Sequence, residues 1–83
     1  MVMEEITVIH DSQVYRFNGV LLGKNRCEKM YKTSEGKFII FSKDGNDYAL
    51  YTFPEMEGVL ESGVPEWVAW AGLDFPEYMI NRL

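Results

Sequence analysis

His10 and Cys27 are the two side chains of this sequence best suited to nucleophilic catalysis. A catalytic thiolate needs a base within hydrogen-bonding reach and a third group that orients the base. One histidine and one cysteine in a short chain rarely form such a pair, so we interpret Cys27 as a small buried apolar residue. His10 follows a strand pattern and precedes Asp11, which indicates a surface or turn residue. We therefore expect no catalytic residues and no enzyme.

The run Asp44-Gly45-Asn46-Asp47 has the composition of a calcium loop, but the bidentate glutamate that such a loop needs does not follow at the required spacing. We interpret the run as a hairpin turn. A zinc site needs several Cys or His ligands, and the whole chain has one of each. A glycine-rich phosphate loop is also missing from the sequence, so we expect neither a metal nor a cofactor.

Three carboxylates fall within one short segment, at Glu55, Glu57 and Glu61. Paired carboxylates perform general acid–base chemistry when burial raises the pKa of one of them. Carboxylates are seldom fully buried, so the sequence favours a solvated acidic face here.

Single-strand nucleic-acid binding by a sheet would need basic groups beside aromatic platforms. Such residues occur together in the middle of the chain. Their region has no net charge, the chain as a whole is acidic, and no ribonucleoprotein motif is present. We keep a sheet-based nucleic-acid binder as a remote alternative; its residues would be Lys29, Lys32, Lys37 and Lys43 around Tyr31, Phe38 and Phe41.

Trp67 and Trp70 stand three residues apart, which places them on one face of a helix. The simpler interpretation is that both rings pack on the sheet. The alternative is that one ring is exposed as an anchor for a partner, because tryptophan and tyrosine are frequent at interaction hot spots. Phe75 and Tyr78 add a second apolar stripe, which a homodimer would cover.

The elements that hold these residues follow from hydrophobic periodicity. Alternating apolar and polar residues predict a meander of four to five antiparallel strands over residues 4–53. Asp11-Ser12 should turn the chain after the first strand, and Asn18-Gly19 is expected as the two-residue turn of a hairpin. A bulge or loop is expected over 23–27, and Pro54 should end the last strand. The nearly continuous apolar run 37–42 predicts a central strand, in the middle of the sheet, with both faces at least partly covered.

After Pro54 the period becomes helical. Two to three short helices are expected, packed on one face or end of the sheet, at 55–61, 64–72 and, capped by Asp74, 75–83. The 83 residues suffice for one hydrophobic core, so we expect a single α+β domain over 1–83.

Two segments, 17–23 and 30–40, carry a glycine hairpin, an aromatic-basic-threonine strand and a Gly-Lys-aromatic turn. In these features the chain resembles small bacterial and phage-borne proteins of unknown function. The resemblance covers about a third of the chain. It implies a meander sheet and a bacterial or mobile-element setting, and it supplies no activity.

Charge is distributed unevenly along the chain. Residues 1–53 hold seven acids and seven bases, whereas residues 54–83 hold six acids against Arg82 alone, so the net charge of −5 belongs to the last third. The sequence has no apolar run long enough for a membrane span and no signal peptide, which indicates a cytoplasmic protein.

These observations favour a small acidic interaction protein, an adaptor or inhibitor that binds another, basic protein through its C-terminal helices. A self-assembling homodimer is the alternative. The expected contact residues are Glu55, Glu57, Glu61, Trp67, Trp70, Phe75 and Tyr78.

Overall fold

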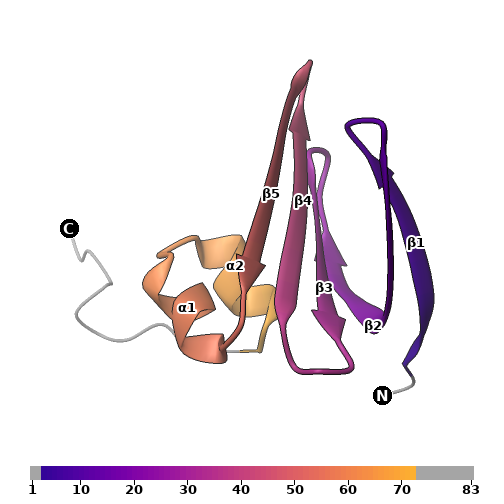
Figure 1. Cartoon of the computed structure of the whole chain (residues 1–83). Helices are drawn as coiled ribbons and strands as arrows, with labels where there is room; N and C mark the ends of the chain where they lie inside the picture. Colours follow the sequence, from indigo (N-terminus) through magenta and orange to yellow (C-terminus); the bar gives the residue numbers. More distant parts are fainter. Residues whose placement is uncertain (1–2, 73–83) are drawn as a thin grey trace.

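The structure, a computed structural model, describes residues 3–72, and within this range it contains five strands followed by two short helices (Figure 1). Every strand pairs antiparallel with the next, in the order β1-β2-β3-β4-β5. The predicted α+β meander is therefore confirmed, while the third helix predicted over 75–83 lies outside the described residues. The elements are β1 (Glu4–His10), β2 (Gln13–Lys24), β3 (Glu28–Thr33), β4 (Phe38–Asp44), β5 (Asp47–Phe53), α1 (Met56–Glu61) and α2 (Pro65–Trp70).

Two of the strand connections are two-residue turns, as the sequence predicts. Asp11 and Ser12 join β1 to β2 with φ angles of 51° and 63°, the left-handed conformation that a type I′ turn needs at both positions. Gly45 and Asn46 join β4 to β5, and Gly45 alone has a positive φ, of 62°. The run that resembled a calcium loop is thus a hairpin turn.

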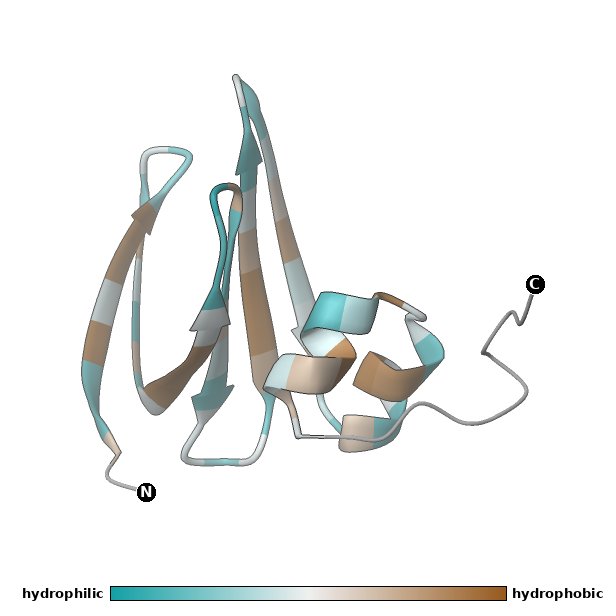
Figure 2. Ribbon diagram, turned by 180° about the vertical axis from the view of Figure 1, so that it is seen from behind, coloured by the Kyte–Doolittle hydropathy of each residue, from teal (hydrophilic) through white to brown (hydrophobic). Residues whose placement is uncertain are grey.

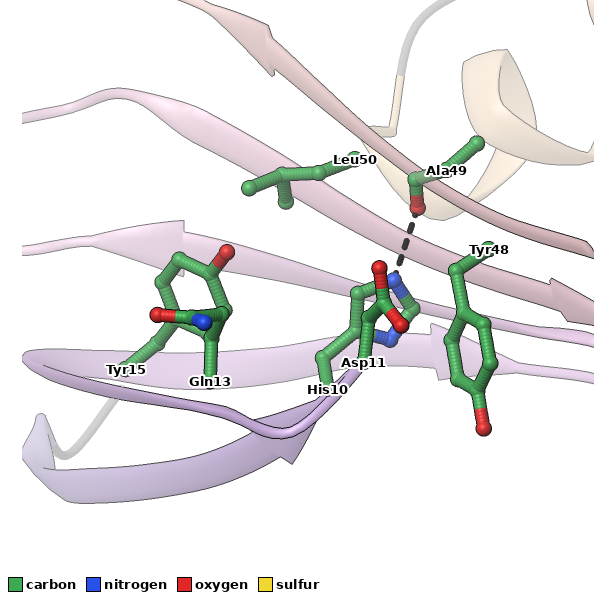
Figure 3. Close-up of a pocket in the computed structure, with 7 residues that line it drawn as sticks. All are labelled: His10, Asp11, Gln13, Tyr15, Tyr48, Ala49 and Leu50. Carbon is green, nitrogen blue, oxygen red and sulfur yellow. Dashed lines mark hydrogen bonds between the residues drawn. The ribbon is translucent and has the colours of Figure 1, made fainter.

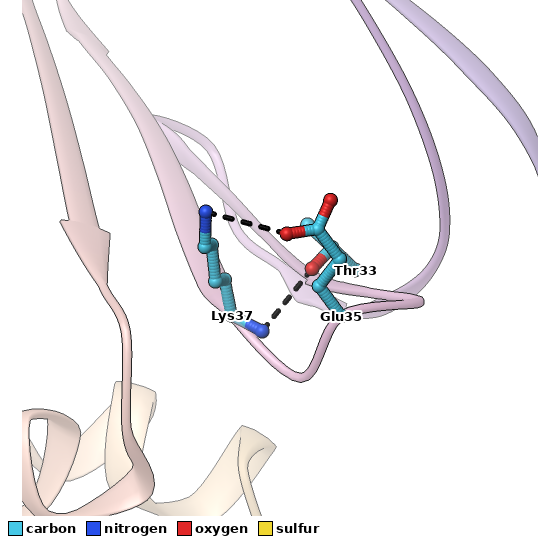
Figure 4. Close-up of polar contacts among 3 residues, drawn as sticks. All are labelled: Thr33, Glu35 and Lys37. Carbon is cyan, nitrogen blue, oxygen red and sulfur yellow. Dashed lines mark hydrogen bonds and ion pairs between the residues drawn. The ribbon is translucent and has the colours of Figure 1, made fainter.

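The connection from β3 to β4 is held by the backbone and side chain of Thr33 (Figure 4). The Thr33 carbonyl oxygen accepts a hydrogen bond from the Gly36 amide at 3.0 Å, and its hydroxyl oxygen accepts one from the Lys37 amide at 3.1 Å. Gly36 has a φ of 86°, which is accessible to glycine at little cost. The Lys37 ammonium lies 3.4 Å from the Glu35 carboxylate; both side chains are exposed, so this ion pair contributes little stability.

The predicted hairpin at Asn18-Gly19 is wrong, because β2 continues through both residues. Gly19 pairs with Glu4 on one side and with Thr33 on the other, so it belongs to β1–β2 and β2–β3 pairing at once. A Cβ at this position would lie 2.5 Å from the Lys32 carbonyl oxygen. The glycine therefore permits a close approach of the β2 and β3 backbones. Along its length β2 bends sharply (Figure 1).

The bend folds the β1–β2 hairpin across one face of the remaining strands. Aromatic side chains of the hairpin meet those of β3 and β4 there, with the Tyr15 and Phe41 ring centroids 5.4 Å apart. The other face of β4 packs against the helices through Phe38 and Ile40, which are fully buried. Both faces of β4 are thus covered, as the apolar run 37–42 predicts. The predicted position in the middle of the sheet is wrong, because β4 is the fourth of five strands and β3 lies in the middle.

The helices lie beside the end of β5, after Pro54 has ended that strand (Figure 1). Hydrophobic and hydrophilic residues alternate along the strands (Figure 2), as expected when one face of each strand points to a core. The core under the helices is formed by Met30, Phe38, Ile40, Val59 and Trp67.

Trp70 of α2 packs directly on the backbone of Gly23, where a Cβ would overlap its indole ring. For the segment 23–27 the sequence predicts a bulge or a loop: the register of the β2–β3 pairing shifts between Leu21 and Gly23, at its border, and residues 25–27 form the loop between the two strands. Neither helix within residues 3–72 is long and apolar enough to cross a membrane.

Candidate functional site

The predicted acidic contact residues lie on the solvent side of the helices. Glu55 is the extended residue before α1, Glu57 lies in its first turn and Glu61 ends it, and all three are exposed. Glu66, in the first turn of α2, is exposed as well and accepts a 2.7 Å hydrogen bond from the Asn25 side-chain amide. Lysine and arginine do not occur between residues 54 and 72. We call Glu55, Glu57, Glu61 and Glu66 the acidic helical surface.

The two tryptophans differ in burial. Trp67 is 7% exposed and packs in the core beneath α2, with its ring centroid 5.1 Å from that of Tyr51. Its indole nitrogen has no hydrogen-bond partner among the described residues. Trp70 is half-buried at the margin of the core. The simpler interpretation, packing on the sheet, thus describes both rings, and a contact of either ring with a partner stays a prediction.

Two apolar side chains near the acidic helical surface are not among the residues predicted from the sequence. Met56 is 43% exposed at the start of α1, and Tyr51 on β5 is 42% exposed while its ring contacts Trp67. In the sequence, the position of Met56 between Glu55 and Glu57 was the signal that could have indicated its exposure. Phe75 and Tyr78, the remaining predicted contact residues, lie outside the described residues.

The aromatic residues considered for nucleic-acid stacking are buried. Tyr31, Phe38 and Phe41 are 7%, 0% and 4% exposed, so their faces are not available to bases. Burial also raises the pKa of the Tyr31 phenol above its usual value. The stacking platform that this remote alternative requires is therefore not formed by these three side chains.

His10 is not the surface residue that the sequence indicated, because it is 8% exposed. Its ring contacts Phe41 and Tyr48 edge-on, with centroid distances of 5.2 and 5.1 Å. The Nε2 atom lies 3.0 Å from the Ala49 carbonyl oxygen, and since a carbonyl only accepts, Nε2 donates. The alternation Ile6, Val8, His10 was the signal that would have placed His10 on the inner face of β1.

Cys27 is exposed in the β2–β3 loop, which corrects its interpretation as a buried apolar residue. The loop is ordered by Asn25, whose side-chain oxygen accepts hydrogen bonds from the Cys27 and Glu28 amides at 2.8 and 2.7 Å. Within the part of the chain that the structure describes, no hydrogen bond joins Cys27 to His10, which is buried and donates to Ala49.

A shallow hollow of about 200 Å³ opens beside His10, where the end of β1 meets the beginning of β5 (Figure 3). The rings of Tyr15 and Tyr48 and the apolar side chain of Leu50 contribute to its wall. Asp11 carries the one formal charge among its lining residues. The hollow is lined by His10, Asp11, Gln13, Tyr15, Tyr48, Ala49 and Leu50.

The Asp, Glu, His and Cys side chains of residues 3–72 form no group of three that could hold a metal ion. Comparisons with protein-family models, with curated protein sequences and with solved structures found no match to this chain. Function is therefore inferred from the surface of the molecule itself.

Proposed function

We propose that this protein is a small non-enzymatic interaction module that binds a basic partner protein through its acidic helical surface. In this role it acts in the cytoplasm as an adaptor or inhibitor, in keeping with the bacterial or mobile-element setting that its sequence resemblance implies. The surface of the partner would be rich in lysine and arginine.

One observation carries the proposal: four exposed carboxylates lie in the two helices and at the start of the first, and residues 54–72 hold no base to neutralise them. Such an uncompensated surface attracts basic proteins and raises their association rate. Met56 and Tyr51 supply exposed apolar area near the charges, and hot spots at interfaces need such area as well as charge.

The test compares two triple charge reversals in a cross-linked pull-down from the native cytosol. Glu55→Lys, Glu57→Lys and Glu61→Lys should abolish capture of the partner, whereas Glu4→Lys, Glu5→Lys and Glu35→Lys, on the neutral part of the chain, should retain it. Capture of a basic protein should also fall as salt rises, because salt screens exposed charges. Equal capture by both variants, or no captured protein at all, would contradict the proposal.

A homodimer is the second candidate, and a different surface favours it. Ile9 and Val14 face each other across β1 and β2 and are 75% and 59% exposed, an apolar pair on the outside of the hairpin. Light scattering should then show a dimer that becomes a monomer when both residues are replaced by threonine. A monomer in the unmodified protein at high concentration would exclude this candidate.

A further inference from the structure

We infer that the hollow beside His10 is a binding site for an ammonium group, such as a trimethylammonium headgroup or a lysine side chain. The site goes beyond the proposed function and uses another part of the molecule. β5 begins beside the hollow and ends beside α1, so the two surfaces lie toward opposite ends of this strand (Figure 1).

The chemistry of the wall selects for positive charge. Rings of Tyr15, Tyr48 and His10 line the hollow, and the faces of tyrosine rings attract cations through their quadrupole. The Asp11 carboxylate lies at the same hollow and carries the one formal charge among the lining residues (Figure 3). Aromatic rings together with a single carboxylate favour a cation over an anion.

One ring of the wall already contacts a cation of the protein itself, its cross-strand neighbour Lys43. The Lys43 ammonium lies 5.3 Å from the centroid of the Tyr48 ring, although Lys43 does not line the hollow. The geometry falls within the roughly 6 Å at which cation–π attraction acts. The protein's own ammonium thus uses one of the rings that a ligand would contact.

The wall is also held in place before a ligand arrives. His10 is fixed by its hydrogen bond to Ala49 and by edge contacts with Phe41 and Tyr48. Tyr15 is in turn fixed against Phe41, with the ring planes at 61°. A rigid wall lowers the entropy lost on binding, so a small ligand loses less affinity to ordering.

Size limits the ligand. The volume of about 200 Å³ is below the roughly 300 Å³ at which pockets for drug-sized ligands begin. A single small headgroup fits this space, and a nucleotide or sugar chain does not. The remainder of a larger ligand would extend into solvent.

The experiment titrates the full chain with choline and, in parallel, with 3,3-dimethylbutanol, its neutral carbon analogue, while the tyrosine and histidine resonances are followed by NMR. We expect saturable shifts at Tyr15, Tyr48 and His10 with choline, and binding of the neutral analogue at least about tenfold weaker, because it lacks the charge. Equal binding of the two probes, or no saturation by choline at about 100 mM, would overturn the inference, since cation–π attraction would then add nothing to the affinity.

Variants then test the charges. Asp11→Asn should weaken choline binding by about threefold to fivefold, as removal of an exposed opposite charge does. Lys43→Gln should strengthen binding, because it removes a neighbouring like charge. Asp44→Asn is the matched control, an exposed acid in the other turn that does not line the hollow. An equal loss in Asp11→Asn and Asp44→Asn would contradict a specific site.

The source of the ammonium group is distinguished with a peptide that carries trimethyllysine. Tighter binding of the peptide than of choline supports a side chain of a partner protein as the ligand. Tighter binding of choline supports a free small molecule. Binding of unmodified lysine peptide with equal strength supports a site for any ammonium group.

Discussion

Tyr31 shows how burial of one polar group makes stability depend on pH. Its ring lies between the sheet layers, and burial raises the pKa of its phenol. A folded-state pKa above the unfolded value of about 10 means that the folded state resists ionisation, so stability is complete below that pH and falls as pH rises through the folded pKa.

We therefore expect Tyr31→Phe to reduce the loss of stability at alkaline pH. The measurement is the free energy of unfolding from denaturant titrations at about pH 8 and at pH values above about 10, on either side of the unfolded pKa of tyrosine. Tyr48→Phe is the control, because Tyr48 is 39% exposed. If both variants lose stability with pH as steeply as the unmodified protein, burial of Tyr31 is not the cause.

Gly23 is the residue on which the packing of α2 depends most directly. A methyl group at this position would overlap the Trp70 ring, so Gly23→Ala forces α2 to shift. We expect a cost of about 1–3 kcal/mol, the usual range for overpacking. In a Trp70→Leu background the same substitution should cost less, because the ring that it meets is gone. Equal costs in both backgrounds would locate the strain elsewhere.

At the scale of elements, substitutions in the two tight turns should change stability in opposite directions. Ser12 has a φ of 63°, although it is not a glycine. Gly45 has a φ of 62°, and no atom lies within 4 Å of the position that a Cβ added to Gly45 would occupy. Ser12→Gly should relieve a left-handed penalty of roughly 1 kcal/mol, and Gly45→Ser should introduce one. Thermal unfolding of both variants checks the signs, and a shift in the same direction for both would contradict the assignment of strain to these φ angles.

The same turns show which parts of the fold the sequence could predict. The turns at Asp11-Ser12 and Gly45-Asn46 and the strand end at Pro54 are predicted correctly, because turn chemistry is local. Asn18-Gly19 has the best local hairpin signal and is nevertheless inside β2, since its glycine is needed where the Lys32 carbonyl approaches. That contact joins residues far apart in the sequence, and no local pattern reports it.

The site could be predicted only in part for the same reason. Exposure of Glu55, Glu57 and Glu61 followed from composition and helical period alone. The burial of His10 and the hollow beside it depend on how β1 folds back to meet β5. Such a contact between the first and last strands is a property of the tertiary structure.

At the scale of the whole molecule, the His10–Ala49 hydrogen bond joins the two edge strands of the sheet. His10 belongs to β1 and Ala49 belongs to β5. Without this hydrogen bond, the two edge strands would face each other unbonded at this point. The bond and the ring contacts of His10 thus close the hairpin layer over the aromatic core.

His10→Phe separates the two contributions, because phenylalanine keeps a ring but cannot donate to the Ala49 oxygen. We expect a loss of about 1 kcal/mol for the hydrogen bond, and a larger loss, about 2–4 kcal/mol, in His10→Ala, which removes the ring contacts too. Amide hydrogen exchange should become faster in β1 and β5 and stay unchanged under the helices, where a separate core holds β4. Ile9→Ala, at the neighbouring exposed position, should change stability by less than about 0.5 kcal/mol. If exchange in His10→Phe is unchanged, ring packing alone closes the layer, because the edges then stay together without the bond.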